Sequence, residues 1–265
     1  DTDGAPINRN ERSVIYQRAK KQIDTIPFGT QLDVYAEGYE WMTHSIKPLD
    51  HNLLDHHPRV KFGGSKCRQP YNMSVLNVSA MSFGSLSSNA VEALNAGAKI
   101  GGFAHNTGEG GISPYHLKHG GDLIWQIGTG YFGARTEDGN FSDDAFQKNA
   151  SRPEVKMLHL KSYPAFITID GRDGGTGAAP PEFTNFVGMP LLDALAFADD
   201  ALRGFGIRDQ LRLIASGKLL SGFHMVRAMA LGADTCNSAR AMMMAIGCIQ
   251  ALDCNKNSCP TGVAT

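Results

Sequence analysis

Three cysteines near the C-terminal end of the sequence have the spacing of metal-cluster ligands. Five residues separate Cys248 from Cys254, four separate Cys254 from Cys259, and Pro260 follows. Thiolates on short loops can converge on one iron–sulfur cluster, in which each iron takes one outside ligand. Three ligands suit a three-iron cluster, or a four-iron cluster with an outside ligand. Structural zinc usually needs a fourth ligand and CxxC pairs, which this sequence lacks, and three unrelated thiols are the remaining alternative.

The number and placement of the glycines also indicate a functional site. The chain holds 30 glycines in 265 residues, about 11% where roughly 7% is average. They gather in short stretches, such as 108–111, 128–130, 171–177 and 217, each just after a predicted strand. Glycine lets the backbone approach a ligand closely. The pattern therefore predicts several ligand-binding loops at one edge of a sheet.

Short strands and helices that alternate from residue 74 onward must position these loops. Strands are predicted at 74–80, 103–106, 123–127, 157–160, 165–169, 211–215 and 233–238, and helices at 86–98, 221–231 and 240–251. Such alternation indicates a parallel sheet. A doubly wound sheet would place its glycines at one switch point, with a GxGxxG after the first strand. Glycines after many strands favour a (β/α)₈ TIM-type barrel, with its site at the carboxyl ends of the strands.

The predicted organisation is an irregular N-terminal arm over 1–73, packed on a barrel over 74–265 that includes the cysteine loop 248–262. The His-rich piece 51–57 is interpreted as a solvated loop, and Cys67 and Cys236 as plain thiols. Only residues 162–164 separate the extended stretch 157–161 from the stretch 165–169, whereas parallel neighbours need a crossover of about a dozen residues. We therefore expect a missing segment near 161–164 and a barrel without its middle strands.

Composition narrows the classes of partner. The chain has 25 basic and 26 acidic residues and a pI near 6.8, which argues against a nucleic-acid-binding surface. No apolar run approaches the roughly 18 residues of a membrane span, and no signal peptide is visible. Clustered cysteines suit a reducing compartment, so a cytoplasmic protein is expected. Attachment to a membrane through a segment upstream of Asp1 stays open.

Five ordered motifs resemble the FMN-binding synthase domain of glutamate synthase. They are 79–87 (SAMSFGSLS), 106–111 (NTGEGG), 170–177 (DGRDGGTG), 215–218 (ASGK) and 247–265, which holds the three cysteines. The phrases 26–34 and 123–133 are similar to the stand-alone, FMN-binding glutamate synthase-related proteins in particular. The resemblance implies a barrel that holds FMN at its C-terminal face beside a [3Fe–4S] cluster. It also implies reductive formation of L-glutamate from 2-oxoglutarate and ammonia.

The resemblance assigns roles residue by residue. Glu109 is expected to handle substrate or protons, although a carboxylate bonded to backbone amides is the alternative. The implied cluster ligands are Cys248, Cys254 and Cys259. The implied FMN-binding residues are Ser79, Ala80, Met81, Ser82, Asn106, Thr107, Gln126, Gly174, Gly175, Thr176, Ser216, Gly217, Lys218, Ser238, Ala239 and Arg240. The residues from 216 onward would form the barrel's phosphate site.

The sequence departs from the family in two ways. About a hundred residues are missing between the third and sixth strands, including a lysine-bearing Gly-Ala-Lys-Pro-Gly motif. No amidotransferase domain and no dinucleotide motif are present, so a partner chain or free ammonia would supply nitrogen. A ferredoxin or an NAD(P)H-dependent reductase would supply electrons, and we expect a homo-oligomer. Two alternatives remain: an FMN and iron–sulfur oxidoreductase with another substrate, and a non-catalytic electron-transfer subunit of a larger complex.

Overall fold

A parallel, curled sheet of seven strands forms the centre of the protein. The computed structural model describes residues 7–25, 29–43, 47, 49–65, 67–160, 166–172, 187–251 and 258–262. The sheet order is β6-β5-β4-β3-β9-β8-β7, and every pairing is parallel. Its strands are β3 (Leu76–Val78), β4 (His105–Asn106), β5 (Leu123–Ile127), β6 (Val155–Leu160), β7 (Phe166–Asp170), β8 (Arg212–Ser216) and β9 (Thr235–Ser238).

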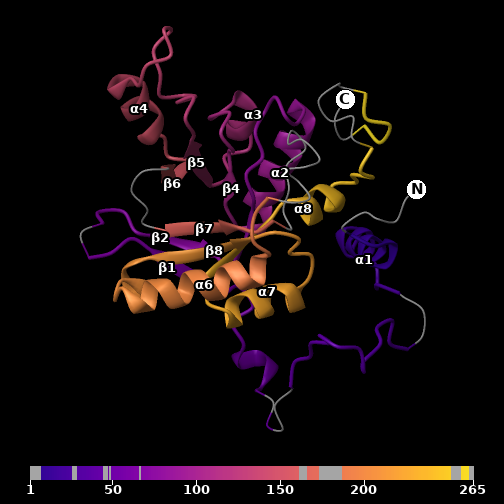
Figure 1. Ribbon diagram of the computed structural model, residues 1–265. Helices are drawn as coiled ribbons and strands as arrows, with labels where there is room; N and C mark the ends of the chain where they lie inside the picture. The colour runs from indigo at the N-terminus through magenta and orange to yellow at the C-terminus, as the bar shows by residue number, and fades with distance from the viewer. Residues whose placement is uncertain are drawn as a thin grey trace.

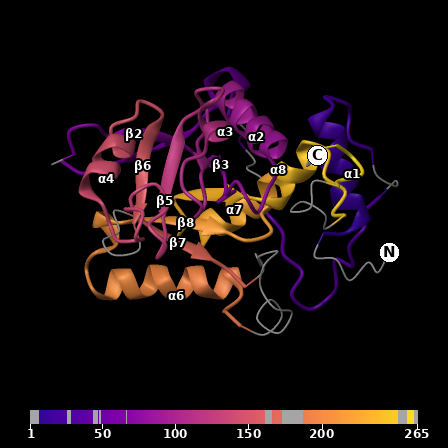
Figure 2. The ribbon, with the colours of Figure 1, turned by 90° about the horizontal axis from the view of Figure 1, so that it is seen from above.

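Helices cover the outer face of the sheet. In Figures 1 and 2, α2 lies beside β3 and β4, and α6 lies beside β7 and β8 at the far end of the curled sheet. Helix α1 lies beside α8. The helices are α1 (Arg9–Ala19), α2 (Ser88–Gly101), α3 (Pro114–Leu117), α4 (Asp143–Ala150), α6 (Leu191–Gly204), α7 (Gly222–Ala230) and α8 (Arg240–Ala245), with single 3₁₀ turns η1 (His51–Leu53) and η2 (Arg208–Gln210). The alternation of strands and helices confirms the α/β, TIM-type fold class as an open half-barrel.

Helix α2 shows how local sequence sets an element's limits. The Ser87 side chain accepts a hydrogen bond from the Ala90 amide and caps the first turn. Gly102, with φ +66°, ends the helix in the left-handed conformation that glycine tolerates. Val91 and Leu94 are buried, as the helical spacing predicts, and Leu94 belongs to one apolar cluster with Val78 of β3. Helix α8 is shorter than its predicted range of 240–251 because the chain turns at Gly247, with φ +102°.

An antiparallel hairpin closes the amino end of the sheet. Strands β1 (Arg59–Phe62) and β2 (Tyr71–Ser74) pair with each other. Phe62 and Met73 from this hairpin belong to one buried cluster with Ile124 and Ile214 from the sheet. The hairpin was not predicted, and it spans the predicted boundary between the arm and the barrel. Because the hairpin packs at the amino end, the opposite, carboxyl end of the sheet is the end at which a ligand could bind.

The sheet is open because its two edges are not joined to each other. Strands β6 and β7 follow one another in sequence, but they lie at opposite edges of the described sheet. Residues 161–165, where the missing segment is expected, lie outside the described residues. Among the helices that the structure describes, none is both long and apolar enough to cross a membrane.

Candidate functional site

The loops that follow β3 and β4 pack directly against each other at the carboxyl end of the sheet. A Cβ atom on Gly108 would lie 2.9 Å from the backbone nitrogen of Ser82, and one on Gly110 would lie 3.1 Å from the Ser82 Cβ. Gly108 also has φ +66°, a conformation that side chains disfavour. The two loops can come together only because these positions carry no side chain.

Backbone hydrogen bonds hold the segment after β3 in place. The Ser79 amide donates to the carbonyl of Ser238 at 3.2 Å, and the Met81 amide donates to the carbonyl of Asn106 at 3.0 Å. Ser79 and Met81 are buried, Ser82 is half-buried and Ala80 is exposed. The segment is therefore tied to the neighbouring strands on both sides.

Two predicted site residues use their hydroxyl groups within the protein. The Thr107 hydroxyl accepts from the Gln126 amide at 3.1 Å and donates to the carbonyl of Gly108 at 3.0 Å. The Ser238 hydroxyl donates to the carbonyl of Leu219 at 2.7 Å. Both side chains are buried. These two hydroxyls therefore brace the strand ends by donating their protons to backbone carbonyls.

Glu109 brings a carboxylate to the end of the next strand. The residue is exposed, and its Oε2 would lie 2.9 Å from a Cβ atom placed on Gly128, just after β5. Gln126, near the end of β5, is half-buried. The Asn106 side chain accepts from the Gly108 amide at 2.9 Å and shapes the glycine loop. The glycines thus let Glu109 lie beside β5.

A row of polar side chains crosses four adjacent strands. Asp170 pairs in register with Ser216, Ser216 with Asn237, and Asn237 with Asn77. Residues in register on parallel strands point to the same face of the sheet. The buried Oδ1 of Asn237 has no hydrogen-bond partner among the described residues. From this row, sequence reasoning named Ser216 as a site residue and included Asp170 in a motif, but it gave no role to Asn77 or Asn237, although an asparagine in each of two predicted strands was a visible signal.

The loop after β8 has an unusual backbone and adjoins a cavity. Gly217 has φ +141°, and Lys218 has φ +42°, a strained value for a residue with a side chain. Arg240 begins α8, just after β9. The nearby cavity of about 370 Å³ is lined by Glu11, Pro190, Leu191, Leu192, Asp193, Gly217, Lys218, Leu220, His224 and Arg227.

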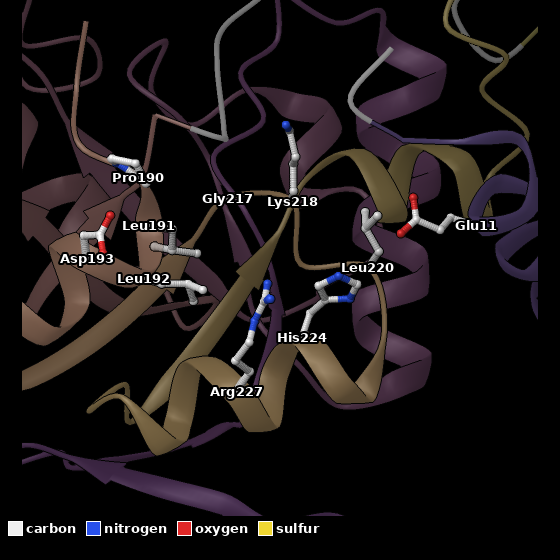
Figure 3. A pocket seen from close by; sticks show the side chains of 10 residues that line it. All are labelled: Glu11, Pro190, Leu191, Leu192, Asp193, Gly217, Lys218, Leu220, His224 and Arg227. Carbon is white, nitrogen blue, oxygen red and sulfur yellow. The ribbon is translucent and has the colours of Figure 1, made fainter. Parts of the chain in front are cut away.

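One charged side chain of this cavity is paired with a residue outside its lining. Figure 3 shows Lys218 extending away from His224 and Arg227. Arg227 forms an ion pair with Glu40 of the N-terminal arm. Burial, and secondly the charge of Arg227, lower the pKa of His224. Lys218 therefore reaches a different part of this edge from the α7 side chains.

Two of the three predicted cluster ligands lie in described segments. The Cys248 sulfur accepts from the Gln250 amide at 3.3 Å, and its carbonyl accepts from the Tyr16 hydroxyl at 2.6 Å. The Cys259 sulfur lies 3.1 Å from the Thr261 hydroxyl. Cys254 lies outside the described residues, as do Gly174, Gly175 and Thr176. Within the part of the chain that is described, no three His, Cys, Asp or Glu side chains gather as a metal site.

A family model and several curated proteins match this chain, and both kinds of match concern glutamate synthase. The model of the family described as the conserved region in glutamate synthase matches residues 31–157 and 146–265. A glutamate synthase large subunit-like protein of Bacillus subtilis, YerD, is 34% identical over 291 residues, covering 77% of this chain and 55% of the relative. An archaeal-type glutamate synthase [NADPH] of Thermotoga neapolitana is 26% identical, covering 70% of this chain and 51% of the relative.

The solved structures that match this chain include a flavocytochrome b2 mutant with benzoylformate. Its TM-score is 0.48 at 13% identity, covering 76% of this chain and 65% of that chain. This chain spans about half the length of the curated relatives named above.

Proposed function

The chain belongs to the glutamate synthase family, and from this membership we propose an FMN- and iron–sulfur-dependent oxidoreductase. Its proposed reaction is the reductive formation of L-glutamate from 2-oxoglutarate and ammonia. The observation that carries the proposal is the packing of the two motif loops after β3 and β4 around Ser82 at the carboxyl edge of the sheet. In parallel α/β folds this edge is where ligands bind.

The chemistry of this edge fits FMN. The Ser82 amide has no hydrogen-bond acceptor among the described residues, and the glycine at position 108 lets the neighbouring loop pack closely beside its nitrogen. The polar edge of a flavin accepts hydrogen bonds from such amides. On the far side, Gly217, Lys218 and Arg240 bring backbone amides and two cations to the strand ends, where barrels bind phosphate. The proposed flavin-binding set is Ser79, Ala80, Met81, Ser82, Asn106, Thr107, Gln126, Gly174, Gly175, Thr176, Ser216, Gly217, Lys218, Ser238, Ala239 and Arg240.

Each side chain then has a defined task. Bound FMN would supply reducing equivalents to the substrate carbon. Glu109 would hold or deliver a proton at its carboxylate, since it is exposed beside β5 and the glycine loop. Gln126 would orient the polar edge of the ring, and Lys218 would offset phosphate charge. The apolar cluster beneath the strand ends would exclude water from below.

We propose that Cys248, Cys254 and Cys259 hold the cluster, and the contacts of Cys248 support its role. The amide that donates to the Cys248 sulfur would stabilise a thiolate there. The Tyr16 hydroxyl fixes the Cys248 carbonyl, so α1 helps to position this ligand. A [3Fe–4S] cluster with three thiolates would pass electrons from a ferredoxin or a reductase. An amidotransferase chain or free ammonia would supply nitrogen, and we propose a homo-oligomer in a cytoplasmic setting.

The test begins with the protein as purified. Flavin and iron–sulfur absorbance bands are expected, followed by glutamate formation from 2-oxoglutarate and ammonium with a reduced electron donor. Replacing Glu109 with glutamine should lower kcat by about 100-fold or more, since proton transfer by a positioned group contributes about that factor. Flavin reduction without glutamate would point to another substrate, and absence of both cofactors would refute the proposal.

The shortness of the link between β6 and β7 favours a second candidate, a non-catalytic electron-transfer subunit. The alignment with YerD extends over 291 residues although it covers 77% of this 265-residue chain, so it places many residues of YerD opposite gaps here. A segment lost near 161–164 would remove the family's lysine motif. The complete coding sequence decides this point, because a lysine-bearing segment between residues 160 and 166 would reject the second candidate.

A further inference from the structure

His116 is a buried residue whose two ring nitrogens both form hydrogen bonds, yet no motif of the proposed site includes it. It lies in α3, directly after the glycine loop, and its side chain is fully buried. Its Nε2 lies 2.9 Å from the carbonyl oxygen of Met81, 35 residues earlier in the chain. The contact therefore joins α3 to the segment after β3.

The contacts define which nitrogen carries the proton. A carbonyl oxygen can only accept, so Nε2 donates to Met81. The Ser113 amide can only donate, and it lies 3.2 Å from Nδ1, which therefore accepts. The Ser113 hydroxyl also lies 2.8 Å from Nδ1 and accepts from the His116 amide at 3.3 Å. His116 is thus a neutral imidazole protonated at Nε2, and it forms the capping box of α3 together with Ser113.

The environment of the ring keeps it neutral. Burial lowers the pKa of His116, although the hydrogen bond to Met81 acts in the opposite direction. His105 packs beside it, with ring centroids 5.1 Å apart, and burial lowers the pKa of His105 to about 3. Neither ring carries charge near pH 7, so the donor function of Nε2 is stable there.

Both ends of Met81 are fixed by this arrangement. Its amide donates to the Asn106 carbonyl at 3.0 Å, while its carbonyl accepts from His116. The peptide that contains the Met81 carbonyl also contains the Ser82 amide, and in a trans peptide these two groups point in opposite directions. A donor on the carbonyl holds the amide toward the opposite side and polarises it. No acceptor for the Ser82 amide is found among the described residues.

We propose that His116 is a positioning residue for the flavin: its Nε2–H holds the Met81–Ser82 peptide so that the Ser82 amide faces the cofactor. This inference rests on the proposed FMN site. His116 touches neither substrate nor flavin and acts through the backbone. Its partner Ser113 fixes the orientation of the ring from the other side.

The test compares three variants of the full protein by FMN titration of the apoprotein, with flavin fluorescence as the signal. His116→Ala should raise the FMN Kd about tenfold, since one buried hydrogen bond is lost. His116→Gln should remain within about threefold of the wild type, because its amide can donate to Met81 and its carbonyl can accept from Ser113. His119→Ala is the matched control on an exposed position of the same segment, and its Kd should not change.

The outcomes separate this inference from the proposed function. Thermal unfolding first establishes that each variant is folded, and the glutamine variant retains the test if His116→Ala does not fold. Wild-type protein that binds FMN, together with a folded His116→Ala of equal Kd, would overturn the inference alone. Equal loss in the alanine and glutamine variants would also overturn it, because the effect would then be loss of packing. Wild-type protein with no affinity for FMN would overturn both.

Discussion

His105 offers a direct test of how burial controls stability in the layer between the sheet and its helices. Its side chain is fully buried in β4, and both ring nitrogens lack hydrogen-bond partners among the described residues. Leucine has a similar size and no polar atoms. Replacing a buried, unsatisfied polar group by an apolar one removes its desolvation cost. His105→Leu should therefore be stabilising at neutral pH, by about 1 kcal/mol.

The same substitution should change how stability depends on pH. Burial, with a smaller effect from His116, lowers the pKa of His105 from 6.5 to about 3 in the folded protein. The unfolded chain then binds a proton below about pH 6.5 that the folded protein does not bind, so stability falls as pH falls. Between about pH 7.5 and 5.5 this residue should cost the wild type about 1.4 kcal/mol. His105→Leu removes that cost, so its advantage should grow to about 2.4 kcal/mol.

Urea unfolding at the two pH values measures both effects. The difference between the variant and the wild type should be larger at the lower pH. His119→Leu, at an exposed position, should show no such change. A His105→Leu protein that is less stable than the wild type at neutral pH would refute the unsatisfied state of the ring. An equal difference at both pH values would refute the lowered pKa.

Two further substitutions probe the loops and the outer layer. Gly111→Ala should destabilise the protein by about 1–3 kcal/mol in urea unfolding, because the new Cβ would lie 2.7 Å from the Phe132 carbonyl oxygen and the residue has φ +79°. The same substitution should weaken FMN binding. An unchanged free energy of unfolding would contradict the close contact. Arg208→Met should cost about 2–3 kcal/mol because it leaves the buried Asp199 carboxylate without its 2.5 Å partner. Arg203→Met is the matched control, since Arg203 also pairs with Asp199 but is largely exposed. This substitution should cost under about 1 kcal/mol. Equal losses of stability in the two variants would refute the stronger role of the buried pair.

The local order of elements could be predicted because local signals determine it. Serine before α2 and glycine after it mark that helix, and glycines mark the strand ends. The β1–β2 hairpin could not be predicted in the same way, since its strands have only four residues each and the residues that they cover lie far away in the sequence. Its place is set by apolar contacts of Phe62 and Met73 with distant strands.

Only part of the candidate site could be predicted from the sequence. Motif loops could be assigned to one edge of the sheet, because parallel strands share the direction of their carboxyl ends. The row from Asp170 to Asn77 depends on strand register, which the sequence does not specify over such short strands. The bond from His116 to Met81 depends on how α3 packs beside β4. Sequence reasoning therefore assigned loops to this edge and named Thr107 and Ser238, but it missed Asn77, Asn237 and His116.

The link between β6 and β7 shows why the sheet stays open. The other connections between consecutive strands of the sheet contain at least 16 residues, as between β4 and β5 (107–122), whereas five residues (161–165) join Leu160 to Phe166. Six Cα steps reach at most about 22 Å. A parallel return along the five residues of β7 uses about 17 Å of that length, so little of it remains to cross from one edge of the sheet to the other. A chain so connected can bring β6 and β7 to facing edges, but it cannot supply the strands that would join them.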